Sequence, residues 1–183
     1  MSRTFMQRLI GAAKLQPEVY EEVEADHSAL GQALGVVVLS SVATALGGAA
    51  YAGIGGIVVG IIVAIIGWFV WAGLTYVIGT KFLPEPQTSS DMGELLRTIG
   101  FSSAPGILRI FGLIPALGYI VYLVVGVWML IAMVIAVRQA LDYRSTWRAV
   151  GVCLIGWVIQ IVVVWALFNL LGHSTAGAGS TAM

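Results

Sequence analysis

The chain has 183 residues, of which 59% are hydrophobic and 10% are charged, and nine Lys and Arg balance nine Asp and Glu. About a quarter of the residues of an ordinary soluble domain are charged, and a nucleic-acid-binding domain carries a strongly basic surface. The composition therefore excludes a water-facing surface over most of the molecule, and it excludes a nucleic-acid partner.

Three long stretches of the chain contain no Asp, Glu, Lys or Arg: residues 27–80, 110–137 and 149–183. Charge-free apolar stretches of more than about 18 residues are long enough to cross a bilayer as helices. The sequence thus predicts an all-α fold, a polytopic transmembrane helical bundle of about five spans. We place this bundle at residues 28–171, after N-terminal cytoplasmic or interfacial helices at residues 1–27 and before a disordered tail at residues 172–183.

The N-terminal segment begins with apolar residues that share one helical arc: Phe5, Met6, Leu9, Ile10 and Ala13. This pattern predicts a short amphipathic helix in the headgroup plane. Pro17 then ends that helix and opens a second one, because proline is tolerated at the first helical position. The second helix carries a run of acidic residues up to Asp26.

The first two spans are predicted at residues 29–50 and 54–80, joined by a glycine-rich turn. Small residues recur in both spans at four-residue spacing: Gly31 with Gly35, and Gly56 with Gly60. Such spacing lets helix backbones approach closely. It fits packing of the two spans on each other, and it also fits a homo-oligomer.

The third membrane segment, residues 91–114, is interrupted. Asp91 and Glu94 have the spacing of a capping box, which predicts a helix start. Pro105 removes an intrahelical hydrogen bond and clashes with the preceding turn, which predicts a break. A broken span and a re-entrant pair of half-helices both fit this pattern.

The fourth and fifth spans are predicted at residues 116–138 and 149–171, and the loop between them carries Arg138, Arg144 and Arg148. Short cytoplasmic loops collect Lys and Arg. The N-terminal segment and alternate loops hold these residues, which places the N-terminus in the cytoplasm and the chain in the cytoplasmic (inner) membrane.

Arg97 and Arg109 of the third segment are the candidate binding residues, because arginine within a span is costly. One hypothesis is that they face a polar cavity at the break and grip a lipid phosphate or an anionic solute, with Glu94 beside them. The alternative is structural: Arg97 pairs with Glu94, or both arginines reach the headgroups.

A second set of candidates is a docking contact on the cytoplasmic side. We expect Glu21, Glu22 and Glu24 to lie near Arg144 and Arg148 and to hold the N-terminal helices over the bundle. The alternative is an exposed acidic surface that recruits a basic partner.

Catalytic and metal-site patterns are missing from the sequence. Ser102 follows Gly100 and Phe101 as in intramembrane serine proteases, but no histidine lies within a span to activate it. The single cysteine, Cys153, cannot form a disulfide or a thiolate metal cluster within the chain. We therefore expect no enzyme activity, no cofactor and no metal.

Five sequence stretches resemble bacterial members of the Yip (Ypt-interacting protein) membrane family, over nearly all of residues 17–168: PEVYEEVEAD, GWFVWAGLTYVIGT, GELLRTIGFSSAPGIL, VVGVWMLIAMVIAVRQALDY and VCLIGWVIQ. The resemblance implies five spans with a cytoplasmic N-terminus. Eukaryotic relatives bind small Rab-type GTPases in vesicle traffic. This chain lacks their long N-terminal extension and a counterpart of its tyrosine-containing motif, so a GTPase partner is not carried over.

The function expected from these features is non-enzymatic: a membrane-organising or partner-binding role, with membrane lipids, a second copy or another membrane protein as partners. The alternatives are a small transporter or lipid-handling protein with an anion site at the broken third span, and an accessory subunit of a larger membrane complex. Interrupted helices mark substrate positions in many transporters.

Overall fold

The computed structural model describes residues 3–48, 53–114 and 116–178, and all the regular secondary structure in these ranges is helical. Within this part of the chain, four helices are long and apolar enough to cross a membrane: His27–Gly48, Ile54–Phe82, Gly118–Ala140 and Thr146–Val163. The predicted all-α membrane fold is confirmed. The predicted third span is the segment that is not one continuous helix.

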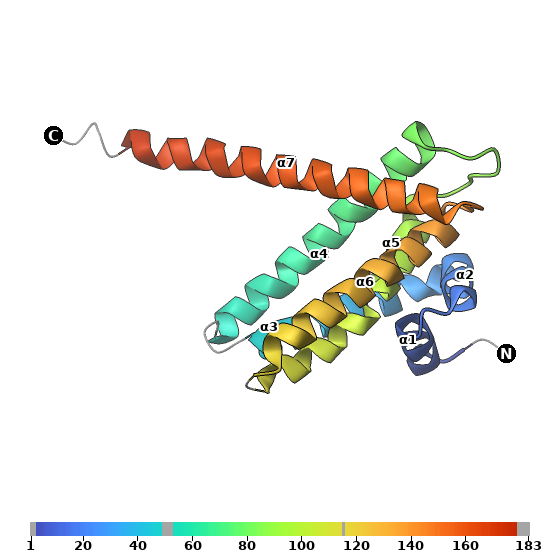
Figure 1. Cartoon of the computed structure of the whole chain (residues 1–183), viewed down its shortest axis with the longest axis horizontal. Helices are drawn as coiled ribbons and strands as arrows, with labels where there is room; N and C mark the ends of the chain where they lie inside the picture. The colour runs from blue at the N-terminus through green and yellow to red at the C-terminus, as the bar shows by residue number, and fades with distance from the viewer. Residues whose placement is uncertain (1–2, 49–52, 115, 179–183) are drawn as a thin grey trace.

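Two short helices, α1 (Phe5–Ala13) and α2 (Pro17–Ala25), lie together against the bundle (Figure 1). Thr4 and Gln7 form a capping box that starts α1. Pro17 stands in the first turn of α2, as predicted. The Tyr20 hydroxyl donates to the Ala12 carbonyl at 3.1 Å and thereby fastens one helix to the other.

The first two membrane helices lie close to the predicted ranges of residues 29–50 and 54–80. A 3₁₀ turn, η1 (His27–Ala29), leads into α3 (Leu30–Gly48), and α4 (Gly53–Val77) continues as a π-helical turn, η2 (Ile78–Phe82). The residues between α3 and α4, where we predicted the glycine-rich turn, lie outside the described residues.

The break in the third segment is confirmed. Helix α5 (Met92–Ser102) starts with the expected capping box, since the Asp91 carboxylate accepts from the Glu94 N–H and the Glu94 carboxylate accepts from the Asp91 N–H. After Ser103 the chain continues as a 3₁₀ helix, η3 (Ala104–Leu113), with Pro105 in its first turn. Proline is tolerated there because no intrahelical donor is needed at a helix start.

The broken segment runs beside α3 in the same direction. The contacts follow the same order along both: Gly100 on Ala33, Gly106 on Ser40 and Gly112 on Gly47. The segment therefore extends from one end of α3 to the other. It packs as a full-length element of the bundle rather than as a loop that turns back halfway.

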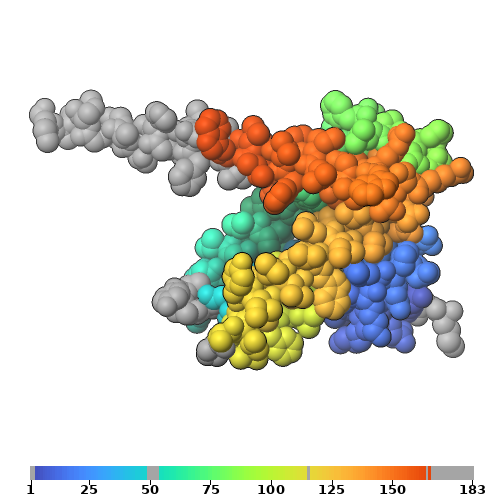
Figure 2. All heavy atoms as spheres, viewed as in Figure 1, coloured from blue at the N-terminus to red at the C-terminus, as the bar shows by residue number. Residues whose placement is uncertain are grey.

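The last two helices are α6 (Gly118–Ala140) and α7 (Thr146–Ala178). Figure 1 shows α7 crossing the bundle and extending beyond it. In Figure 2, α7 and α6 cover the near face and α4 is set back between them. Because α7 continues to Ala178, the backbone of residues 172–178 is helical, where we predicted a disordered tail. Residues 179–183 lie outside the described residues.

The bundle has a buried core and also presents many large apolar side chains on its outside. Ala33, Val36 and Ala136 are fully buried, while Ile54 is 83% exposed and Leu130 is 61% exposed. A soluble protein does not expose an apolar surface of this extent. Lipid is the solvent that this surface fits.

Three parts of the chain meet at one end of the bundle. The Glu85 carboxylate, in the α4–α5 connection, accepts from the Arg144 N–H at 3.0 Å and pairs with Arg148 at 3.4 Å. The Tyr143 hydroxyl lies 2.8 Å from the Leu83 carbonyl oxygen, to which it donates. Since α2 also packs on α5 and α6, the N-terminal helices and the two charged connections share one end.

Candidate functional site

The candidate site is built on the face of the broken segment that lies toward α3 and α6. A 3₁₀ helix has three residues per turn, so residues three apart lie on one face. In η3 these are Gly106, Arg109 and Gly112. An added methyl group at Gly106 would meet Ser40, and one at Gly112 would meet Tyr122 at 2.8 Å. The two glycines let η3 pack closely, and the arginine projects from the same face.

Arg109 has few partners for a half-buried cation. Its Nη1 donates to the Thr44 hydroxyl at 3.4 Å, and its guanidinium carbon lies 5.5 Å from the centre of the Tyr122 ring. The Tyr122 hydroxyl donates to the Thr44 carbonyl at 2.6 Å and so fixes the ring. Among the buried side-chain nitrogen and oxygen atoms of the described residues, Arg109 Nε is the one without a hydrogen-bond partner.

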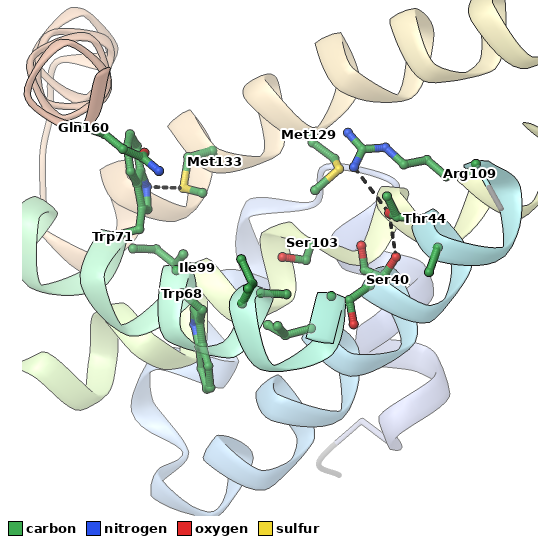
Figure 3. Close-up of a pocket in the computed structure, with 18 of the residues that line it drawn as sticks. Ser40, Thr44, Trp68, Trp71, Ile99, Ser103, Arg109, Met129, Met133 and Gln160 are labelled. Carbon is green, nitrogen blue, oxygen red and sulfur yellow. Dashed lines mark hydrogen bonds between the residues drawn. The ribbon is translucent and has the colours of Figure 1, made fainter. Parts of the chain in front are cut away.

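A cavity of about 620 Å³ opens beside Arg109 (Figure 3). Arg109, Thr44 and Ser40 gather at one part of it, and Trp71, Met133 and Gln160 lie at another. Its volume falls in the range of small-molecule sites, about 300 to 1,000 Å³.

One wall of the cavity is a single face of α4, formed largely by small residues: Gly56, Gly60, Val63, Ala64, Gly67, Trp68 and Trp71. From Gly56 to Trp71 this wall is about 22 Å long at 1.5 Å per helical residue. Val63 is 62% exposed, so the cavity is open to the side of the bundle. Lipid surrounds that side in a membrane.

Arg109 lies on a different element from every other charged residue of the chain. The remaining Lys and Arg, and all nine Asp and Glu, belong to the N-terminal segment, to the connections α4–α5 and α6–α7, or to the adjoining turns of α5 and α6. Arg109 lies instead beside Gly47, near the opposite end of α3. That end holds one positive charge and no acidic group to balance it.

The lining of the cavity has few ionisable groups. Its described lining contains no Asp, Glu, His or Cys, so it has no general base and no nucleophile with a base beside it. The described residues also hold no group of three or more metal-ligating side chains. Apolar walls with a few polar groups are typical of ligand pockets.

Arg97, the other predicted binding residue, does not line the cavity. It is buried, at 3% exposure, and its Nε donates to the carbonyls of Val23 and Glu24 at 3.0 Å each. A second donor, Nη2, also contacts the Glu24 carbonyl. A cation is favourable at the C-terminal end of a helix, where carbonyls lack intrahelical partners. Arg97 therefore caps α2, and the predicted pairing with Glu94 is replaced by this contact.

The acidic residues of α2 and the arginines of the α6–α7 connection were predicted to lie close together, but in the structure each group binds other partners. Glu22 binds Arg3 at 2.6 Å and Arg8 at 2.9 Å, and Glu21 accepts from Gln139 at 2.7 Å. Arg148 pairs with Glu85, and the Arg144 backbone N–H also binds Glu85. The N-terminal helices contact the bundle instead through Arg97, Gln139 and Trp128, whose Nε1 donates to the Ala13 carbonyl at 2.8 Å.

The predicted small-residue contacts are also corrected. An added methyl group at Gly31, Gly35 or Gly60 would meet nothing within 4 Å, and Gly56 lines the cavity. The close approaches of glycines between α3 and the broken segment lie instead at Gly100 and in η3. Four-residue spacing does not find these, because the partner of α3 is partly a 3₁₀ helix with a three-residue period.

Sequence reasoning missed Arg8, Thr44 and Tyr122. Arg8 is 3% exposed and binds Glu22 and Asp26, which ties α1 to α2. A signal for Thr44 was present: it lies four residues after Ser40 in a charge-free span, where polar side chains are expected to face protein rather than lipid.

Glu24 gives the docked N-terminal helices a pH dependence. Burial, and then the nearby charges of Asp142, Glu94 and Glu21, raise the pKa of Glu24 to about 8 from 4.5. A carboxyl group with a raised folded-state pKa adds stability below pH 4.5, and that stability is lost as the pH rises toward 8. Docking of α2 is therefore expected to weaken between pH 5 and pH 8.5.

Glu24→Gln tests this pH dependence, because glutamine keeps the neutral shape at every pH. Hydrogen exchange of residues 17–25 is expected to be the same in the wild type and the variant at pH 5, and faster in the wild type at pH 8.5. Glu18→Gln, at an exposed position of α2, is the matched control. Equal exchange of wild type and Glu24→Gln at both pH values would contradict the prediction.

A model of the Yip1 domain family matches residues 15–168 of the chain. No curated protein and no solved structure matches it.

Proposed function

The chain belongs to the Yip1 domain family, and we propose that it is a lipid-handling membrane protein that takes one lipid chain from the bilayer into the cavity beside α4. The family is not known as enzymatic, and we propose a non-enzymatic role here too. The observation that carries the proposal is the cavity itself: about 620 Å³, with a long apolar wall, a lateral opening and one cation.

The same arrangement supports five crossings with the N-terminus in the cytoplasm of the inner membrane. The N-terminal helices and the connections α4–α5 and α6–α7 meet at one end of the bundle. The broken segment follows α3 from end to end, so it adds a fifth crossing to the four continuous helices. Most Lys and Arg lie at the shared end, which is the cytoplasmic one by the positive-inside rule.

Filling the cavity tests the proposed function. Gly60→Phe places a ring where an added methyl group meets nothing within 4 Å and where the cavity wall lies. Native mass spectrometry of the protein released from nanodiscs is expected to show one retained lipid on the wild type and none on this variant. Gly35→Phe adds the same ring on the open face of α3, outside the cavity lining, and is expected to keep the lipid. Retention by Gly60→Phe would refute the proposal.

A partner-binding or membrane-organising role is the second candidate, and one observation favours it. The Gly31 and Gly35 face of α3 has open space around it within the described residues, although such faces pack well against another helix. The partner is a second copy or another membrane protein, including a larger complex. The wild type and Gly35→Phe are purified side by side to identify the partner. A dimer that is present in the wild type and lost in the variant supports a second copy as partner, and a co-purifying chain that is lost in the variant supports another membrane protein.

A further inference from the structure

We infer that the lipid in this cavity is an anionic phospholipid, held by its phosphate at Arg109 in the leaflet opposite to the N-terminal helices. The inference rests on the proposed function and adds to it the class of lipid and the leaflet. It depends on three properties of Arg109: its unused donors, its position along the bundle and the absence of negative charge around it.

The unused donors of Arg109 match a phosphate group. Guanidinium has five N–H donors in a planar fork, and in the described structure one bond, Nη1 to the Thr44 hydroxyl, is made. Nε is buried without a partner, which is unfavourable for a donor unless a ligand supplies the acceptor. Phosphate oxygens accept two parallel bonds from this fork.

The arginine is also held in place before any ligand arrives. Tyr122 lies under the guanidinium, and its hydroxyl bonds to the Thr44 carbonyl. The Thr44 hydroxyl in turn donates to the Ser40 carbonyl at 2.8 Å. A fixed arginine loses little freedom on binding, which is the general advantage of a preorganised site.

The position of Arg109 sets the orientation of the lipid. Arg109 is one turn of η3 before Gly112, close to the end of the segment and beside Gly47 at the end of α3. It therefore lies at the headgroup side of the bundle end that faces away from α1 and α2. From there the α4 wall leads toward Trp71 for about 22 Å, so an acyl chain attached to a phosphate at Arg109 runs along it toward the bilayer centre.

The lack of an acidic residue in the described cavity lining favours some phospholipid headgroups over others. Ethanolamine and choline headgroups carry a cation next to the phosphate, and that cation needs an anion or water as its partner. The described cavity lining has no Asp or Glu, and Arg109 repels a second cation. A glycerol headgroup adds hydroxyls and no charge, so phosphatidylglycerol fits the site better.

Lipid selectivity tests the inference. The wild type, Arg109→Gln, Arg109→Lys and Gly60→Phe are placed in nanodiscs with equal amounts of phosphatidylglycerol and phosphatidylethanolamine, and the retained lipid is identified by native mass spectrometry. The wild type is expected to favour phosphatidylglycerol roughly tenfold, because both lipids offer the same phosphate but the ethanolamine cation would lack an anionic partner beside Arg109. Arg109→Gln is expected to retain a lipid without preference, and Arg109→Lys to keep part of the preference.

The possible outcomes separate the inference from the proposed function. If Arg109→Gln favours phosphatidylglycerol as strongly as the wild type, the inference is wrong while the lipid site stands. If Gly60→Phe retains lipid like the wild type, the proposed function fails as well. If inorganic phosphate displaces the lipid from the wild type, the site is one for a free anion and the inference is overturned. Should Arg109→Gln not fold, Arg109→Lys decides, because an unchanged preference there excludes recognition by the guanidinium fork.

Discussion

Gly100→Ala is expected to lower the free energy of unfolding by about 1 to 3 kcal/mol, the usual effect of overpacking a tight contact. The new methyl carbon would lie 2.7 Å from Ala33 Cβ and 3.2 Å from the Ala33 backbone. Neither neighbour can turn aside, because one is a methyl group without rotamers and the other is backbone. The measurement is thermal unfolding in mild detergent, followed by loss of the monodisperse species.

Gly35→Ala is the matched control for this prediction, because it adds the same methyl group to the partner helix α3 and meets nothing within 4 Å. Alanine also favours a helix over glycine by up to about 1 kcal/mol. The control is therefore expected to unfold at the wild-type temperature or above it. A Gly100→Ala protein as stable as Gly35→Ala would mean that α5 and α3 do not pack as described.

Arg97→Met is expected to release α2 from the bundle. The substitution keeps an unbranched apolar stem but removes the guanidinium group and its donors, which leaves the Val23 and Glu24 carbonyls without their partner. An unsatisfied buried carbonyl costs about 1 to 3 kcal/mol. Hydrogen exchange of residues 17–25 is expected to rise strongly, while exchange in α6 stays close to that of the wild type.

Arg148→Met provides the comparison for Arg97→Met. The Arg148 side chain is 47% exposed and pairs with Glu85 at 3.4 Å, and exposed ion pairs contribute about 0 to 1 kcal/mol. Little change in exchange at residues 17–25 is expected from it. Equal effects of the two substitutions would show that Arg97 is one surface charge among several rather than the cap of α2.

The helices that sequence reasoning located well are those governed by local rules. Pro17 opens α2, Asp91 and Glu94 cap α5, and Pro105 follows the break in the third segment. Each depends on the backbone chemistry of a few consecutive residues. The approximate positions of the spans followed from composition, because a bilayer sets the minimum length of a charge-free helix.

The contacts between helices were predicted less well, because they depend on which faces meet. Arg97 and Arg109 look alike in sequence, and both were candidates for one anion site. The structure buries Arg97 against α2 and leaves Arg109 at the cavity. Likewise, Arg144 and Arg148 meet Glu85 rather than the acidic helix. Charge patterns show that partners are needed, and the path of the backbone decides which ones are in reach.

The packing of the broken segment explains why the cavity exists. Because η3 is a narrow 3₁₀ helix with Gly106 and Gly112 on its inner face, α3 lies close to it. On the other side, the small residues of α4 leave space that large side chains would fill. The break in the third segment thus brings Arg109 and the apolar wall of α4 to one cavity.

Side-specific labelling tests most directly the claim that the broken segment crosses the whole membrane and places Arg109 opposite to the other charges. Single cysteines are introduced as Ser89→Cys in the α4–α5 connection and Tyr119→Cys at the start of α6, where Tyr119 is 81% exposed, with Cys153→Ala as background. A membrane-impermeant maleimide applied to sealed right-side-out vesicles is expected to label Tyr119→Cys and not Ser89→Cys, and the reverse is expected in inverted vesicles. Labelling of both cysteines from the same side would contradict the account.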